Sequence, residues 1–261
     1  MKIALCHLTL SMGPMEKNLQ KLTRALEIAG EYRADWVITP ETALQGYHFY
    51  KIDPEQKLEP QPATCLHPLR ELARKNHQYL FLGAGEFVKE ENCNYNTCFV
   101  FGPDGELVGK HRKNHSHGYG GEGWVTNSTV AEPVQMGPVK AGIMVCSDAW
   151  YMECPQRLAA QGAQLLVDIA GWPISKECGD PLPSWLRCSK ETGLPMVLCN
   201  QTGKTEWLDF TVGQSVYIEN GELKLSYTGG DALLFFDWDE QTGRGMSEKF
   251  VVVKLKESKK E

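Results

Sequence analysis

Hydrophobic residues in the first part of the chain recur with the period of strands and then with that of helices. Residues 2–10 and 35–39 are apolar runs typical of strands, and the segment between them carries apolar residues at helical spacing. This order predicts a β-α-β unit at the start of the chain. Further predicted elements are a helix over 67–76, a strand over 79–84, and a hairpin of strands 97–101 and 106–110 around a Pro-Asp-Gly turn.

The second part of the chain repeats this order. Its predicted elements are strands over 139–146, 164–170 and 196–200, helices over 153–161 and 185–192, and a hairpin of strands 212–218 and 223–227. Two β-α-β cycles with added hairpins predict an α/β fold in which two mixed sheets pack together with helices outside. Because no linker or composition break divides the chain, we predict one domain over 1–256 and a charged tail over 257–261.

Composition and charge narrow the classes of partner. The 261 residues are 42% hydrophobic, which is enough for a full core, and the net charge is −6 with no basic stripe for a nucleic acid. The longest apolar stretches are far shorter than the roughly 20 residues that span a bilayer, so we expect no membrane insertion. Nine cysteines at irregular spacings and a first segment unlike a signal peptide favour reduced thiols and a cytoplasmic location.

Three segments each place one reactive polar residue after an apolar strand: WVITPETALQGY, GKHRKNH and AGIMVCSDAW. Glu41 follows a strand and a proline, Lys113 lies in a basic run, and Cys146 ends an apolar run. Singly, these residues have ordinary interpretations as a surface glutamate, a solvated lysine and a packed thiol. Together they form a chemical set, because a carboxylate takes the proton of a thiol and an ammonium stabilises an oxyanion.

The order and spacing of these three residues resemble the nitrilase superfamily of carbon–nitrogen hydrolases. The similarity extends through nearly the whole chain. Further segments that carry it are Asn18-Leu19, Tyr95-Asn96-Thr97, PDGE, HRKNH, CSDAWYME, Gly162-Ala163, Gly171-Trp172-Pro173, Asn200 and Gly213-Gln214-Ser215.

The resemblance implies a four-layer α-β-β-α sandwich, assembly into a homodimer or a higher homo-oligomer, and no metal or organic cofactor. It also implies roles for residues at matching positions: Glu41 as general base, Lys113 as the cation that holds the tetrahedral intermediate, and Cys146 as nucleophile. Many members use a second glutamate between the lysine and the cysteine. Glu122 in GGEGW is the candidate by position, and a solvated loop glutamate is the alternative.

The implied reaction is hydrolysis of a small linear amide through a cysteine thioester, releasing ammonia and a carboxylic acid. A backbone N–H near Ser147 is expected to assist Lys113 in holding the oxyanion. Burial would raise the pKa of Glu41 and the adjacent Lys113 would lower it, and the sequence leaves the balance open.

The residues after the cysteine bear on the substrate. True nitrilases have Trp-Glu there, whereas this chain has Ser147-Asp148, which favours an amide over a nitrile. Trp150 and Glu153 resemble the N-carbamoylputrescine amidase pattern, so an N-carbamoyl amine or amino acid is the alternative substrate. The predicted substrate-binding residues are Tyr47, Trp150, Trp172 and Ser147.

Other classes of function fit the sequence less well. His111, His115 and His117 lack the ligand spacing of zinc sites, and we expect no metal. A non-catalytic protein on the same fold would be expected to lose a triad member, and a serine hydrolase would carry Gly-x-Ser-x-Gly, which this chain lacks. No cluster of cations suggests a carboxylate clamp, although Arg157 and Arg187 are available.

Overall fold

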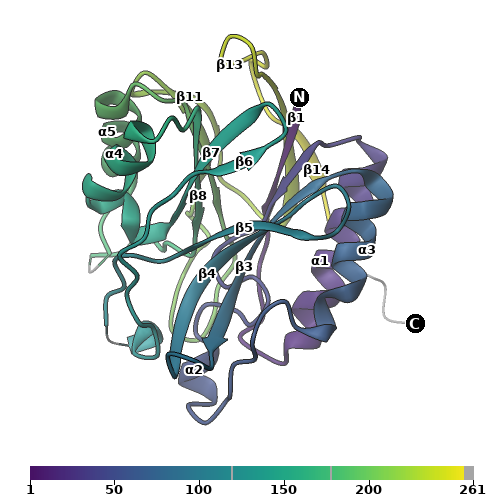
Figure 1. Cartoon of the computed structure of the whole chain (residues 1–261), viewed down its shortest axis with the longest axis vertical. Helices are drawn as coiled ribbons and strands as arrows, with labels where there is room; N and C mark the ends of the chain where they lie inside the picture. Colours follow the sequence, from purple (N-terminus) through teal and green to yellow (C-terminus); the bar gives the residue numbers. More distant parts are fainter. Residues whose placement is uncertain (119, 177, 256–261) are drawn as a thin grey trace.

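The chain folds into two β-sheets that pack face to face, with helices on both outer faces (Figure 1). Helices α1 (Met15–Glu31) and α3 (His67–Asn76) cover one sheet, while α4 (Glu153–Ala160) and α5 (Leu182–Thr192) cover the other. This is the predicted α-β-β-α sandwich, so the fold prediction is confirmed. The residues that the computed structural model describes are 1–118, 120–176 and 178–255.

The first sheet has the strand order β13-β12-β1-β2-β3-β4-β5, and β14 also pairs with β12. Strands β1, β2 and β3 run parallel, and the remaining pairs are antiparallel. The strands are β1 (Lys2–His7), β2 (Trp36–Ile38), β3 (Tyr79–Val88), β4 (Cys93–Phe101), β5 (Leu107–Arg112), β12 (Ala232–Asp239), β13 (Arg244–Gly245) and β14 (Val251–Lys254).

The second sheet has the strand order β11-β10-β9-β8-β7-β6, in which β7, β8 and β9 run parallel. The strands are β6 (Val134–Met136), β7 (Val139–Val145), β8 (Leu165–Ala170), β9 (Met196–Asn200), β10 (Ser215–Glu219) and β11 (Glu222–Tyr227). The parallel strands of each sheet place their carboxyl ends at one edge, which is where α/β folds place functional side chains.

Side chains of β1 alternate between two hydrophobic cores, one on each face of the sheet. Ile3 and Leu5 join the core between the sheets, whereas Ala4 and Cys6 join the core beneath α1 and α3. All four side chains are buried, because successive residues of a strand point to opposite faces and both faces are covered. A central strand of such a sandwich is therefore apolar throughout.

The structure differs from the predicted elements in a few places. The first strand, predicted over 2–10, ends at His7, and the predicted tail over 257–261 lies outside the described residues. Strands β12 and β14 were not among the predicted elements. The signal for β12 is nevertheless present, since five consecutive buried apolar residues over 232–236 are typical of a central strand.

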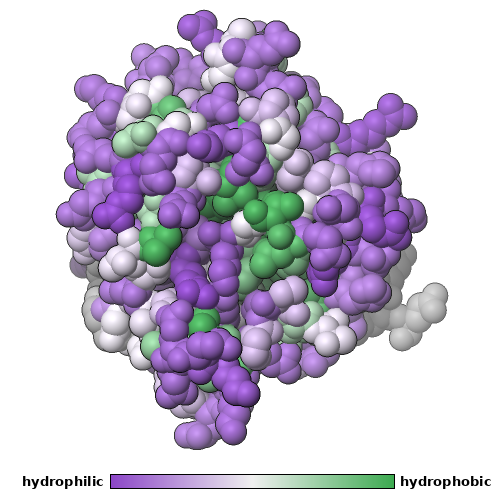
Figure 2. Space-filling view, viewed as in Figure 1, coloured by the Kyte–Doolittle hydropathy of each residue, from purple (hydrophilic) through white to green (hydrophobic). Residues whose placement is uncertain are grey.

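The cysteines and the surface of the molecule have the properties that the composition predicts. Each of the nine cysteines lies in the described part of the chain and is a free thiol. Among the described residues, no helix combines the length and apolarity needed to cross a membrane. Figure 2 shows a mostly polar face with an apolar group near its centre, over the region of β5 and β6, and Leu107 and Val108 of β5 are exposed.

Candidate active site

The three residues singled out from the sequence all follow strands. Glu41 lies three residues after β2, Lys113 directly follows β5, and Cys146 directly follows β7. Because the two sheets pack face to face, residues from both reach the same region at their strand ends. The cysteine comes from one sheet, and the glutamate and the lysine come from the other.

Lys113 lies between two carboxylates. Its Nζ donates a hydrogen bond to Glu41 Oε1 over 2.7 Å and another to Glu122 Oε1. All three side chains are buried, and Glu122 belongs to the short helix η2 (Gly120–Glu122). The structure thus brings Glu122 to Lys113, and the solvated-loop alternative for this glutamate is wrong.

Glu41 is held by further donors. Asn96 Nδ2 donates to Glu41 Oε1 over 2.7 Å, and the backbone N–H of Gly171 donates to Oε2 over 2.8 Å. Gly171 allows this close approach, because a Cβ at that position would lie 2.8 Å from the Tyr47 ring and 3.2 Å from the carboxylate. The carboxylate therefore has a fixed orientation before any substrate binds.

Cys146 begins the short helix η3 (Cys146–Trp150) with a φ of 54°, a left-handed conformation that is uncommon for a residue with a side chain. Its backbone N–H donates to Asp168 Oδ1 over 2.7 Å, and Asp168 is a buried residue of β8. A strained conformation persists only where its surroundings determine it, and such positions cluster at functional sites. Asp168 is one of the groups that fix this turn.

Asp148 links the loop that follows Lys113 to the turn at Cys146 through hydrogen bonds. Its Oδ1 accepts hydrogen bonds from the backbone N–H groups of Asn114 and His115, both at 2.9 Å. Its Oδ2 accepts one from the backbone N–H of Val145 over 3.0 Å and is 2.9 Å from His111 Nε2. One buried carboxylate therefore sets where Lys113 lies relative to Cys146.

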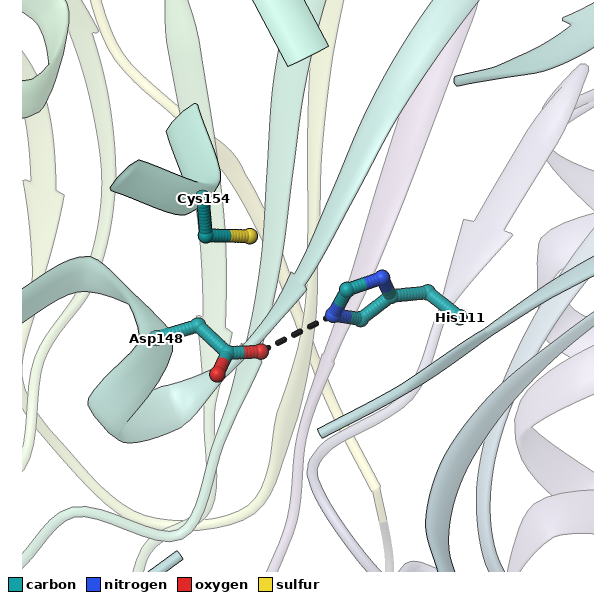
Figure 3. Close-up of side chains that lie close together, drawn as sticks. All are labelled: His111, Asp148 and Cys154. Atoms are coloured by element: carbon teal, nitrogen blue, oxygen red, sulfur yellow. Dashed lines mark hydrogen bonds and ion pairs between the residues drawn. The ribbon is translucent and has the colours of Figure 1, made fainter. Parts of the chain in front are cut away.

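His111, Asp148 and Cys154 form the one described group with a metal-like donor set, with donor atoms within 4.8 Å of one another. Figure 3 shows the imidazole directed at the carboxylate, with the Cys154 thiol of α4 nearby. The carboxylate already accepts four hydrogen bonds, and burial raises the pKa of the Cys154 thiol well above its ordinary value. A metal would require a thiolate and would displace these bonds, so the set fits a structural role.

Burial and neighbouring charges shift the pKa values of the two groups that would exchange a proton, Glu41 and Cys146. Burial raises the pKa of Glu41, and the Glu122 carboxylate adds to this effect, which outweighs the opposing ammonium of Lys113. The pKa of the Cys146 thiol also lies well above its ordinary value, because of burial and the nearby Glu41 carboxylate. The balance left open by the sequence is thus decided for Glu41, and the resting thiol is neutral.

The charged forms of the other two groups, Lys113 and Glu122, are stabilised by their neighbours. Burial would lower the pKa of Lys113, but the carboxylates of Glu122 and Glu41 hold it well above its ordinary value. Burial would raise the pKa of Glu122, but Lys113 and the backbone N–H of His117 hold it below its usual range. An ammonium and a carboxylate therefore persist at neutral pH in a buried position.

Cys146 and Glu122 line a cavity of about 400 Å³, whereas Glu41 and Lys113 are not among its described lining residues. Ser147 is not among its described lining residues, and its hydroxyl instead donates to the backbone carbonyl of His115. Tyr47, Trp150 and Trp172, predicted to bind substrate, do line the cavity. Other described lining residues are His48, Lys51, His117, Glu122 and Cys146.

Several alternatives from the sequence lie away from this cavity. Arg157 donates to the carbonyl of Thr129 and Arg187 to that of Trp150, and neither lines the cavity. The Glu153 side chain is largely exposed, with its carboxylate 3.7 Å from His115 Nε2. Of the two residues that carried the N-carbamoyl resemblance, only Trp150 lines the cavity.

Two residues of the site were missed by sequence reasoning. Asp168 is a lone acid inside the apolar strand β8, and a charged residue in such a strand is a signal that could have identified it. Lys51 lies four residues after the segment WVITPETALQGY and carries no pattern of its own, so only the tertiary structure places it at the cavity.

Comparisons with known proteins identify the family of this chain. The family model described as carbon-nitrogen hydrolase matches residues 2–225. The omega-amidase NIT2 of Mus musculus is 34% identical over 160 residues, 56% of each chain. A glutamine-dependent NAD(+) synthetase of Rhodobacter capsulatus is 29% identical over 210 residues, 77% of this chain and 37% of that protein. The chain thus spans little more than half the length of these curated relatives, or less.

Solved structures show the same fold. The nitrilase-superfamily protein Nit3 of Saccharomyces cerevisiae superposes with a TM-score of 0.80 at 20% identity, covering 90% of this chain and 88% of that one. The amidase NitN from Neterenkonia sp. AN1 gives a TM-score of 0.80 at 21% identity, covering 93% and 94%. With a family model matched over most of its length, the chain belongs to the carbon-nitrogen hydrolase family.

Proposed function

We propose that this chain hydrolyses a small linear amide, releasing ammonia and a carboxylic acid through a thioester on Cys146. The observation that carries the proposal is the buried Lys113 ammonium, held between Glu41 and Glu122 beside a cavity that Cys146 lines. Nucleophilic acyl transfer needs a thiol, a carboxylate to take its proton and a cation to stabilise the oxyanion.

In the first half of the reaction, Cys146 Sγ attacks the amide carbon and its proton passes to Glu41. The carbonyl oxygen becomes an oxyanion, which the Lys113 ammonium and a backbone N–H near Ser147 stabilise, each by on the order of 3 kcal/mol. Glu41 then gives its proton to the nitrogen, the carbon–nitrogen bond breaks, and ammonia leaves. The acyl group remains on sulfur as a thioester.

In the second half, Glu41 takes a proton from a water molecule while the water oxygen attacks the thioester carbon. The carbon–sulfur bond breaks, the proton returns to sulfur, and the carboxylic acid leaves. The raised pKa of Glu41 suits both steps, because it makes the carboxylate a stronger base than an ordinary glutamate. Glu122 keeps Lys113 charged and in place throughout.

The choice of an amide is supported by the lining and by the relatives. The cavity is compact and has three aromatic walls, which suits a short chain rather than a protein substrate. One curated relative is an omega-amidase, and an amidase from Nesterenkonia sp. AN1 is described with acrylamide added at its active site cysteine. N-carbamoyl amines are less favoured because Glu153 lies away from the cavity.

The test is ammonia release from a panel of aliphatic amides, ω-amides of dicarboxylic acids, N-carbamoyl amines and nitriles. We expect turnover on amides by the unaltered chain and none by Cys146→Ala. Cys199→Ala is the matched control, since Cys199 is a buried thiol that does not line the cavity. The proposal is wrong if no member of the panel is hydrolysed, or if Cys146→Ala hydrolyses it as well as the unaltered chain.

A further inference from the structure

The wall of the cavity carries a cation that the proposed reaction does not use. Lys51 lies in the short helix α2 (Phe49–Ile52), at the lower end of the molecule in Figure 1, and lines the same cavity as Cys146. It is the one lysine or arginine among the described lining residues. Its side chain is exposed, so the ammonium is available to a ligand.

The position of this ammonium is defined by a neighbouring ring. Lys51 Nζ lies 5.3 Å from the centroid of the Trp207 ring, within cation–π range, and no described carboxylate forms an ion pair with it. The backbone of Lys51 is fixed as well, because its N–H donates to the carbonyl of His48 over 2.9 Å. The cation is therefore oriented and unneutralised.

His48 adds an uncharged polar group to the same wall. Its ring stacks on Tyr47 with centroids 5.2 Å apart, and its Nδ1 has no hydrogen-bond partner among the described residues. Burial and the Lys51 ammonium lower the pKa of His48 to about 4, so the imidazole is neutral at pH 7. A neutral imidazole beside an ammonium suits an anion.

The one described acid on the cavity wall is already neutralised. The Glu122 carboxylate accepts hydrogen bonds from Lys113, from Tyr47 over 3.2 Å and from the backbone N–H of His117 over 2.8 Å. The unneutralised charge of the described cavity wall is therefore positive, and it belongs to Lys51.

We propose that Lys51, with His48 beside it, binds a carboxylate at the far end of the substrate from the amide. The substrate class is thus a short linear amide with an acidic end, rather than a neutral aliphatic amide. Cys146 directly follows β7 of one sheet, and Lys51 lies in α2, in the segment after β2 of the other sheet. Because both residues line the same cavity of about 400 Å³, one short molecule can contact both. This inference rests on the proposed amide hydrolysis.

Two nearly isosteric substrates test it. Succinamate ends in a carboxylate, and succinamide carries a neutral amide in the same place. We expect the unaltered chain to have a higher kcat/KM for succinamate than for succinamide, after the value for succinamide is halved to account for its two amides. The difference is expected to appear in KM rather than in kcat. In Lys51→Met the ratio of the two kcat/KM values falls by about tenfold, the scale of one hydrogen bond between charged groups.

Two further variants separate charge from structure. Lys51→Arg keeps the positive charge and retains most of the preference, and added salt weakens the preference by screening an exposed cation. Lys75→Met removes a lysine from the exposed end of α3 and leaves the ratio at its original value. The inference is overturned if the ratio in Lys51→Met equals that of the unaltered chain.

Failure of this inference and failure of the proposed function give different results. Hydrolysis of both substrates with no dependence of their ratio on Lys51 overturns only the carboxylate site. If neither amide is hydrolysed, calorimetric binding of succinate still decides the question. Affinity about tenfold weaker in Lys51→Met supports the carboxylate site, and equal affinity or no binding by the unaltered chain overturns it.

Discussion

At the residue scale, the site depends on one buried positive charge shared by two buried carboxylates. Lys113 bonds both Glu41 and Glu122, and all three side chains are removed from water. Breaking a buried ion pair by removing one partner is strongly destabilising, because it leaves charge without compensation. Here the loss of one ammonium leaves two carboxylates facing each other.

We therefore expect Lys113→Met to lose activity and stability together. The kcat/KM for an amide falls at least about 100-fold because the oxyanion loses its cation. The free energy of unfolding in urea falls by about 3 kcal/mol or more. Adding Glu122→Gln removes the second uncompensated carboxylate and recovers part of the stability but none of the activity. Unchanged stability of Lys113→Met would contradict the charge balance described here.

In the proposed mechanism, the raised pKa of Glu41 sets the acid limb of the pH–activity profile. A general base must be ionised, so kcat/KM rises as the pH passes upward through the pKa of this carboxyl. Since burial raises that pKa, the midpoint of the limb lies above 4.5, the ordinary value for glutamate. Measuring kcat/KM from pH 4 to 9 checks this. A midpoint at or below 4.5 would show that Lys113 outweighs burial.

At the element scale, Asp148 joins the loop after β5 to the turn after β7. Its carboxylate accepts three backbone N–H groups and contacts His111. Burial would raise the pKa of Asp148, but hydrogen bonds from His111 and His115 hold it well below the usual range. This group therefore stabilises the fold above the unfolded-state pKa, and the stabilisation is lost as the pH falls toward the lower folded-state value.

The matching prediction concerns Asp148→Asn. We expect a loss of about 3 kcal/mol in unfolding free energy at pH 7, because several charge-assisted hydrogen bonds are lost. The difference from the unaltered chain shrinks as the pH falls below 3.8, the ordinary pKa of aspartate. Urea unfolding at several pH values measures it, with the exposed Glu132→Gln as control. A difference that does not vary with pH would rule out the linkage.

At the scale of the whole molecule, the C-terminal part of the described chain completes the sheet begun at the N-terminus. Strand β12 pairs with β1 on one side and with β14 on the other. Leu234 of β12 is fully buried between the sheets, while Val252, its register partner on β14, is 40% exposed. The same sheet thus contains a core position and a surface position side by side.

This pair yields a stability prediction. Leu234→Ala lowers the free energy of unfolding by about 2–5 kcal/mol, since it leaves a cavity between two sheets. Val252→Ala, at the exposed partner position, changes it by less than about 1 kcal/mol. Chemical unfolding of the two variants in parallel gives both values. Equal losses would mean that burial on β12 does not govern stability.

The homodimer or higher homo-oligomer implied by the family resemblance stays a prediction at this scale. Light scattering in solution tests it, with an expected mass of at least twice the 29.3 kDa of one chain. A mass equal to that of one chain would contradict the expectation.

Local patterns in the sequence predict a large part of the fold and of the candidate site. The β-α-β order follows from apolar periodicity, and Glu41, Lys113 and Cys146 each follow a strand within a recognisable segment. Such features are readable because periodicity and strand ends depend only on neighbouring residues. Glu122 was predicted as a site residue from its position between the lysine and the cysteine. Only the tertiary structure shows its hydrogen bond with Lys113.

Other features depend on contacts between distant segments. Asp168 supports Cys146 across 22 residues, and Lys51 reaches the cavity from a helix of four residues with no motif. The direction of the pKa shift of Glu41 depends on burial and on the charges of Lys113 and Glu122, and all three contributions are set by the tertiary structure. The sequence by itself indicated most of the strands and helices, the family, and the candidate reactive residues Glu41, Lys113 and Cys146. Only the tertiary structure decided which charged side chains are paired and that the Lys51 ammonium at the cavity has no described carboxylate partner. The physical reason is that charge pairing depends on three-dimensional proximity.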